Sequence, residues 1–258
     1  MADVPLKALV DHLDVLLDAP RFADYGPNGL QVEGRSSVRR VVVGVTACLE
    51  LIERAAELGA DAIIVHHGIL WGGTPTLTGS FGRRVRTLMR HDLSLIAYHL
   101  PLDAHLGLGN GASLARRLGV TELAPFGMHK GMAVGVRGVV SPEPDGSPAS
   151  AASFAARIAS ALGVTPLVYP HGPAELRTVG IVTGGAERDI DQAVAAGLDA
   201  FLTGEVSEPT LHTAREDGIH FFSAGHHATE RYGVQSLAAH LEATFGLECH
   251  WIDVPNPA

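Results

Sequence analysis

The sequence predicts an α/β fold of two related lobes, in which mostly parallel sheets are flanked by helices. Residues 41–46 and 62–68 are expected as strands, because short runs rich in Val and Ile are typical of strands buried on both faces of a parallel sheet. A helical stretch at residues 50–58 lies between them, and Gly59 follows it as a C-cap. This order is a strand–helix–strand unit with a right-handed crossover.

The second half of the chain repeats this order, which supports two lobes related by internal duplication. Three segments correspond in order: residues 179–185 to 41–46, 198–205 to 60–67, and 219–227 to 93–99. Two copies at so long a period indicate a duplication and not a solenoid. We expect lobes at residues 1–125 and 126–258, in one compact unit without an inserted domain. The carboxyl ends of their strands would then surround a shared metal cleft.

The other elements follow from helical spacing and from turn-forming residues. Residues 6–17 carry apolar side chains at helical spacing, and Pro5 is compatible with a first turn. Residues 25–30 are dense in turn formers, and we favour a connecting loop there over a rim of the active site. Further elements are expected as a basic helix at 83–90, a helix up to 118, a strand at 132–140, an Ala-rich helix up to 162, helices up to 197 and at 209–217, a long helix up to 245 and a strand at about 249–254.

Composition narrows the class of protein. The 258 residues suffice for a large core, and 46% of them are hydrophobic. A net charge of −9 argues against binding to long nucleic acid or to an anionic membrane, and no apolar run is long enough for a membrane span. Cys48 and Cys249 lack the spacing of a disulfide framework or of a thiolate metal site. We expect a cytoplasmic location.

Histidines and carboxylates gather at or just after the predicted strand ends. They are His66, His67, His99, Asp103, His105, Glu205, His226, His227 and Glu230. Such a donor set without cysteine suits divalent Zn, Mn or Fe. The remaining histidines would then orient the ligands from an outer shell.

Each of these signals has an ordinary structural alternative. His66 and His67 on an extended chain should point to opposite sides, so they would serve two different ions, but such a pair is also common in plain loops. His226 and Glu230 are four residues apart and share a helix face, which also fits a simple surface pair. Their arrival at equivalent ends of duplicated strands favours a shared metal site.

Other reaction classes find little support in the sequence. Gly184 and Gly185 after a strand invite a phosphate cradle, but no GxGxxG or GxxxxGK[ST] pattern is present. No GxSxG pattern is present either, which disfavours acyl-enzyme chemistry. The arginines of residues 83–90 are better explained as a solvated helix face or a subunit contact than as a nucleic-acid site.

Four motifs in order resemble the Nif-three-like family of dinuclear metal-centre proteins, whose members carry the name GTP cyclohydrolase 1 type 2 homologue. They are Val-His-His-Gly at 65–68, Tyr-His-Leu-Pro-Leu-Asp-Ala-His at 98–105, Leu-Thr-Gly-Glu at 202–205 and Ala-Gly-His-His-Ala-Thr-Glu at 224–230. The likeness covers nearly the whole chain. Residues 25–30 depart from the Trp-Asp-Asn stretch of many members.

The resemblance implies a two-lobed fold, a homohexameric ring and two divalent ions per chain. The metal ligands would be His66, His67, Asp103, His226 and Glu230, with Glu230 bridging both ions. His99 and Glu205 match motif positions near the substrate or in the outer shell, and we expect them to move protons.

Two ions held by Asp103 and Glu230 leave a local positive charge, which would attract a small anionic substrate, such as a nucleotide, despite the acidic chain. We therefore expect a hydrolase-like protein in which metal-activated water attacks that substrate. The alternative is a non-catalytic metal-binding protein with a regulatory or scaffold role.

Overall fold

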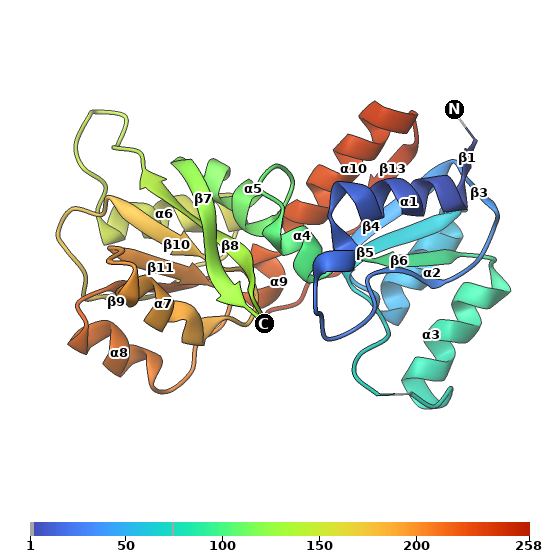
Figure 1. Ribbon diagram of the computed structural model, residues 1–258, viewed down its shortest axis with the longest axis horizontal. Coiled ribbons are helices and arrows are strands. Elements are labelled where there is room, and N and C mark those ends of the chain that lie inside the picture. The colour runs from blue at the N-terminus through green and yellow to red at the C-terminus, as the bar shows by residue number, and fades with distance from the viewer. Residues whose placement is uncertain (1–2, 74) are drawn as a thin grey trace. The chain divides into compact units, whose positions relative to one another are not determined.

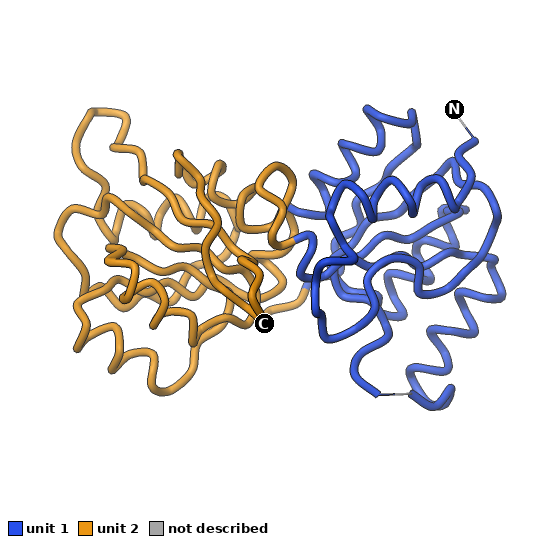
Figure 2. Tube along the Cα trace, in the orientation of Figure 1, with its two compact units in different colours: residues 1–102, 233–255 blue, residues 103–232, 256–258 orange. Residues whose placement is uncertain are grey.

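The computed structural model describes residues 3–73 and 75–258. The chain forms two compact units (Figure 2): unit 1 holds the chain up to residue 102 together with 233–255, and unit 2 holds residues 103–232 and 256–258. The predicted lobes at 1–125 and 126–258 were defined by the sequence repeat. The compact units have different boundaries, and each unit contains one of the two large sheets. Within the described residues, no helix is long and apolar enough to cross a membrane.

Unit 1 is built on a five-stranded sheet (Figure 1). Its order is β13 (Glu248–Trp251), β4 (Arg40–Thr46), β5 (Ala62–His67), β6 (Ser94–Ala97) and β2 (Gly29–Val32). All neighbours pair in parallel except β2, which runs antiparallel to β6 at the edge. A separate two-stranded sheet joins β1 (Val4–Pro5) to β3 (Ser37–Val38).

Helices cover both faces of this sheet, as its continuously apolar strands require. Figure 1 shows α2 (Leu49–Glu57) and α3 (Gly79–Arg90) on one side, with α1 (Leu6–Leu16) and α10 (Arg231–Phe245) on the other. On the first side, Ile63 belongs to a buried cluster with Leu51 of α2 and Leu88 of α3. The predicted helix and strands of the first βα repeat are therefore confirmed, and Gly59 adopts the positive φ of +64° expected of a C-cap.

Unit 2 is built on a six-stranded mixed sheet. Its order is β7 (Val120–His129), β8 (Met132–Val140), β10 (Thr178–Ile181), β11 (Ala200–Thr203), β12 (His220–Ser223) and β9 (Leu167–Pro170). The central β10, β11 and β12 are parallel, and the flanking pairs are antiparallel.

The helices of unit 2 also lie on both faces of the sheet. A buried cluster joins Phe154 and Ile158 of α6 (Ala151–Leu162) to Leu114 of α5 (Asn110–Arg117) and to the strands. Figure 1 shows α7 (Ile190–Ala195) and α8 (Thr210–Glu216) on the opposite side. Two short helices, α4 (Leu100–Ala104) and α9 (His226–Thr229), follow β6 and β12 directly.

The two sheets repeat one arrangement, in agreement with the predicted duplication. Parallel β4, β5 and β6 carry an antiparallel edge strand beside β6, and parallel β10, β11 and β12 carry one beside β12. The compact units differ from the predicted lobes in two places, because residues 103–125 belong to unit 2 and residues 233–255 belong to unit 1. The sequence prediction places the last helix and strand in the second lobe, but β13 pairs in parallel with β4, so this segment completes the sheet of unit 1.

Candidate metal centre

Three imidazoles meet at the carboxyl end of the sheet in unit 1. His66 and His67 end β5, and His99 lies two residues after the end of β6. The candidate ligand nitrogens of the three rings all lie within 4.8 Å of one another. The prediction that the two adjacent rings point to opposite sides is wrong, because their centroids are only 4.6 Å apart. The strand ends at His67, so strict alternation no longer applies to that side chain.

His66 is held in a defined orientation. Its ring is fully buried, and Nδ1 lies 3.1 Å from the carbonyl oxygen of Tyr98. A carbonyl oxygen only accepts, so Nδ1 carries the hydrogen and Nε2 presents the lone pair in the neutral ring. A backbone or carboxylate acceptor on the second nitrogen is the usual arrangement of a metal-ligating histidine.

His99 is oriented by a buried carboxylate that the sequence analysis missed. Its Nδ1 donates to Asp24 Oδ1 at 2.7 Å, and only 2% of the Asp24 side chain is exposed. Burial alone raises the pKa of Asp24, but hydrogen bonds, chiefly from His99 and then from Asn28, outweigh burial and hold the pKa at about 2. Asp24 is therefore ionised and fixes the tautomer of His99, which leaves Nε2 as its basic nitrogen.

The turn-rich segment at residues 25–30 supports the site instead of simply connecting two elements. The side chain of Asn28 accepts a hydrogen bond from the His99 amide at 2.8 Å and donates to Asp24 at 2.9 Å. Strand β2 begins within the segment, at Gly29. Residues 25–28 form the predicted loop, but the preference against a role at the site is wrong, because Asn28 positions a histidine of the site.

The residue after the paired histidines is Gly68, and the side chain of Gln31 fills the space that a Cβ would need there. Gln31 Oε1 accepts the amide of Ile69 at 2.8 Å, and a Cβ on Gly68 would lie 2.3 Å from that oxygen. Any larger residue would displace Gln31 and the turn that leaves β5. Glycine therefore suits this position because it has no Cβ.

In unit 2, an imidazole lies between two carboxylates at the ends of β11 and β12. His226 Nδ1 donates to Glu205 Oε1 at 2.6 Å, and His226 Nε2 lies 3.3 Å from Glu230 Oε2. Glu230 is buried, whereas 49% of the Glu205 side chain is exposed. The predicted pairing of His226 with Glu230 is therefore present, and it is not a plain surface pair.

These carboxylates change the protonation of the imidazole. The hydrogen bond that the His226 ring donates to Glu230, followed by weaker effects of Glu205, outweighs burial and raises the pKa of His226 to about 9. The metal-free ring therefore carries a proton at neutral pH. A metal ion that binds at Nε2 must displace this proton.

Gly184 makes room for the His226–Glu230 pair. It has a positive φ of +70°, and an added Cβ would lie 2.2 Å from Glu230 Oε1 and 3.1 Å from His226 Nε2. The two glycines after β10 therefore lie directly against protein side chains. This close packing explains why glycine occurs there, without a phosphate-binding role.

Asp103 is fixed within α4 of the chain. Its Oδ1 accepts hydrogen bonds from Asn110 Nδ2 at 2.8 Å and from Thr183 Oγ1 at 3.2 Å. The side chain is 6% exposed. The Asn110 amide and the Thr183 hydroxyl are neutral donors, and they orient the Asp103 carboxylate through Oδ1.

Two further histidines of the predicted set, His105 and His227, lie in a turn and in a short helix. His105 Nδ1 accepts the amides of Gly107 and Leu108, at 3.1 and 2.9 Å, and so closes the turn after α4. His227 is buried in α9 beside His226.

The donor chemistry fits a divalent metal ion. Imidazole nitrogens and carboxylate oxygens suit Zn, Mn and Fe, and His66 and His226 each use Nδ1 to contact an oxygen acceptor, which leaves Nε2 as the candidate ligand atom. The fold and these side chains define an α/β protein with histidine and glutamate groups that could hold a metal at its strand ends.

The comparisons identify the family. The chain belongs to the Duf34/NIF3 (NGG1p interacting factor 3) family, whose model matches residues 4–257. A protein of Pseudomonas aeruginosa named GTP cyclohydrolase 1 type 2 homolog is 49% identical over 256 residues, which cover 99% of each chain. An Escherichia coli protein of the same name is 45% identical over the whole of both chains. The resemblance seen in the sequence motifs is thus confirmed.

Solved structures share the fold. The structure of the protein ybgI, of unknown function, matches with a TM-score of 0.91 at 42% identity, covering 99% of this chain and 100% of that one. The protein TTHA1606 of Thermus thermophilus matches with a TM-score of 0.89 at 36% identity and the same coverage.

Proposed function

We propose that this protein is a metal-dependent hydrolase that directs water at a small anionic substrate, such as a purine nucleotide. The proposed metal ligands are His66, His67, Asp103, His226 and Glu230, as the family motifs imply. The observation that carries the proposal is the group of three imidazoles in unit 1, whose ligand nitrogens lie within 4.8 Å of one another. Hydrogen bonds to the Tyr98 carbonyl and to Asp24 fix the tautomers of two of these rings, His66 and His99.

Two divalent ions, Zn, Mn or Fe, are proposed for each chain. A bound divalent ion lowers the pKa of a water molecule and polarises the bond to be broken. His66 would offer a neutral Nε2 to an ion, and His226 would do so after losing its proton, while Asp103 and Glu230 would neutralise part of the ion's charge. A positive charge remains with two ions, and it favours an anionic substrate.

His99 is proposed to accept and return the proton. Asp24 fixes Nδ1–H at 2.7 Å, so Nε2 is the atom that takes a proton from water and later gives it to the leaving group. The negative charge of Asp24 stabilises the ring while it carries that proton. Asp24 is a positioning residue, because it acts through His99.

Glu205 is proposed to exchange protons with solvent. It accepts from His226 Nδ1 at 2.6 Å, and about half of its side chain is exposed, at 49%. The same contact orients His226 for the metal. Glu205 thus serves the site through His226 as well as through its own carboxylate.

The substrate class follows from charge and from the relatives. The matching proteins of Pseudomonas aeruginosa and Escherichia coli are named after a GTP cyclohydrolase, which directs the substrate screen to purine nucleotides. The homohexamer implied by the family resemblance belongs to the same proposal and is measured by light scattering.

The test measures metal and turnover together. The purified chain is loaded with Zn²⁺, Mn²⁺ or Fe²⁺ and assayed with GTP, other nucleotides and phosphoesters. We expect turnover in the wild type, loss of turnover in Glu230→Ala, and wild-type rates in the control Glu242→Ala, whose side chain lies on exposed α10 surface. Stoichiometric metal without turnover across the panel would favour the non-catalytic alternative.

A further inference from the structure

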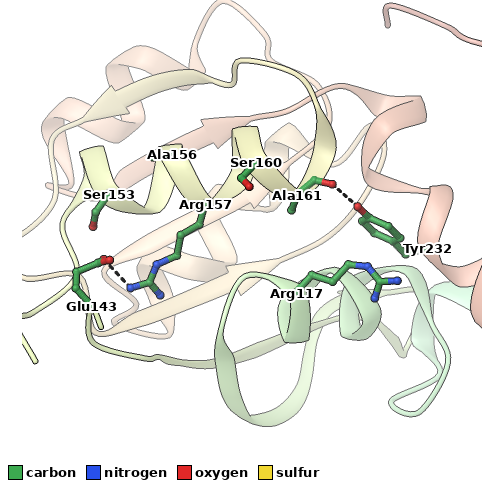
Figure 3. A pocket seen from close by; sticks show the side chains of 8 residues that line it. All are labelled: Arg117, Glu143, Ser153, Ala156, Arg157, Ser160, Ala161 and Tyr232. Atoms are coloured by element: carbon green, nitrogen blue, oxygen red, sulfur yellow. Dashed lines mark hydrogen bonds and ion pairs between the residues drawn. The ribbon is translucent and has the colours of Figure 1, made fainter. Parts of the chain in front are cut away.

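A second cavity lies in unit 2, and none of its lining residues belongs to the candidate metal centre. It has a volume of about 650 Å³ and is open to solvent. Its polar lining consists of Arg117 at the end of α5, Tyr232 at the start of α10, Glu143 after β8, and Ser153, Arg157 and Ser160 on α6 (Figure 3). The volume falls in the range of small-molecule sites.

One wall of the cavity is a neutralised ion pair. Arg157 Nη2 donates to Glu143 Oε1 at 2.6 Å, and their side chains are only 19% and 24% exposed. The hydroxyl of Ser153, and then Arg157, lower the pKa of Glu143, so this carboxylate is ionised. Arg157 is therefore compensated, and the pair serves as a rigid wall (Figure 3).

Arg117 is the uncompensated charge of the cavity. Its guanidinium carbon lies 4.1 Å above the ring of Tyr232, whose hydroxyl donates to the carbonyl of Ala161. Within the described residues, the Arg117 guanidinium has neither a carboxylate partner nor a hydrogen bond. Stacking holds the guanidinium plane without using its N–H donors, which is the state that suits bidentate binding of an oxyanion.

We infer that this cavity binds a small phosphate monoester, with the phosphate on Arg117. Two arginines against one glutamate leave the lining with one net positive charge, although the whole chain carries −9. Ser160 lines the same cavity from α6 and supplies a hydroxyl donor. The volume that remains accommodates the organic part of the ester.

The test uses the full chain after EDTA treatment, so that no bound metal can contribute to phosphate binding. Isothermal titration with inorganic phosphate and with glycerol 3-phosphate should give saturable binding. We expect Arg117→Gln to weaken it at least tenfold and Ser160→Ala to weaken it about two- to threefold. Arg117→Lys should fall between the wild type and Arg117→Gln, because lysine keeps the charge but not the bidentate geometry.

The matched control is Arg215→Gln, which removes an exposed arginine of α8 outside the cavity and should leave phosphate binding unchanged. Thermal unfolding verifies that each variant is folded. No saturable binding by the wild type, or equal binding by Arg117→Gln, would overturn the inference. Equally tight binding of succinate would overturn the assignment to phosphate. The assay is independent of turnover, so its failure is distinct from failure of the proposed hydrolase.

Discussion

The two units present different chemistry at corresponding strand ends. Unit 1 places three imidazoles there, whereas unit 2 places one imidazole, His226, between the carboxylates of Glu205 and Glu230. In the repeat, Glu205 even stands at the position of His67. The two copies of the scaffold therefore carry polar side chains at corresponding positions, but the residue types differ. Unit 1 presents imidazoles at these positions, and unit 2 presents an imidazole with a carboxylate on either side.

The two units also differ in how a carboxylate orients a histidine. Asp24 holds His99 from a site that is 2% exposed, whereas Glu205 holds His226 while 49% exposed. The two hydrogen bonds have nearly the same length, 2.7 and 2.6 Å. Because solvent screens and replaces the exposed contact, equal lengths should not give equal effects.

The largest expected effect is the loss of a ligand from either unit. His66→Gln and His226→Gln should each weaken Zn²⁺ binding by on the order of 100-fold or more, above the ~10- to 100-fold typical of an outer-shell partner. Isothermal titration of EDTA-treated protein measures the affinity. His212→Gln, on exposed α8 surface, is the control. If only one of the two variants lost affinity, the metal would belong to one unit alone.

The next largest effect should come from Asp24→Asn. Loss of the charge and of the fixed tautomer of His99 should reduce metal-dependent turnover by ~10- to 100-fold. The variant Asp18→Asn is the control, because the Asp18 carboxylate is half exposed and pairs with nearby Arg21 on the surface. Turnover that is unaffected by Asp24→Asn would remove His99 from the proposed proton transfer.

The hydrogen-bond partners of the site histidines and of Asp103 could not be predicted from the sequence. The continuous apolar runs of β4 and β5, and the histidines that end β5, were predictable because burial and strand ends are local features. Asp24 is 75 residues from His99, and Thr183 is 80 residues from Asp103, so no local pattern joins them. Strands β2 and β9 were missed for a related reason, since each is a four-residue edge strand defined by its partner in the sheet.

An intermediate effect is expected from Gly184→Ala. Any alanine at positive φ costs about 1 to 2 kcal/mol, and at Gly184 the new Cβ also lies 2.2 Å from Glu230 Oε1. Gly197→Ala is a close control, because Gly197 has a φ of +65° but nothing within 4 Å of the added Cβ. Urea unfolding should show a cost in both variants. Only Gly184→Ala should also weaken metal binding, and equal metal affinity would show that Glu230 can move without loss.

The smallest effect is expected from Glu205→Gln, the exposed counterpart of Asp24→Asn. Metal affinity should fall only a few-fold. In the metal-free protein, the pKa of His226 should drop from about 9 but stay above 6.5, because Glu230 is the larger cause of the shift. NMR titration of the ring measures this pKa.

Because the folded-state pKa is raised, the stability that His226 gives the metal-free protein is complete below pH 6.5 and is lost as the pH rises through about 9. In Glu205→Gln this loss should begin at lower pH. A loss of metal affinity of ~10- to 100-fold, the range expected for turnover in Asp24→Asn, would contradict the comparison, because exposure would then make no difference to a carboxylate that orients a histidine.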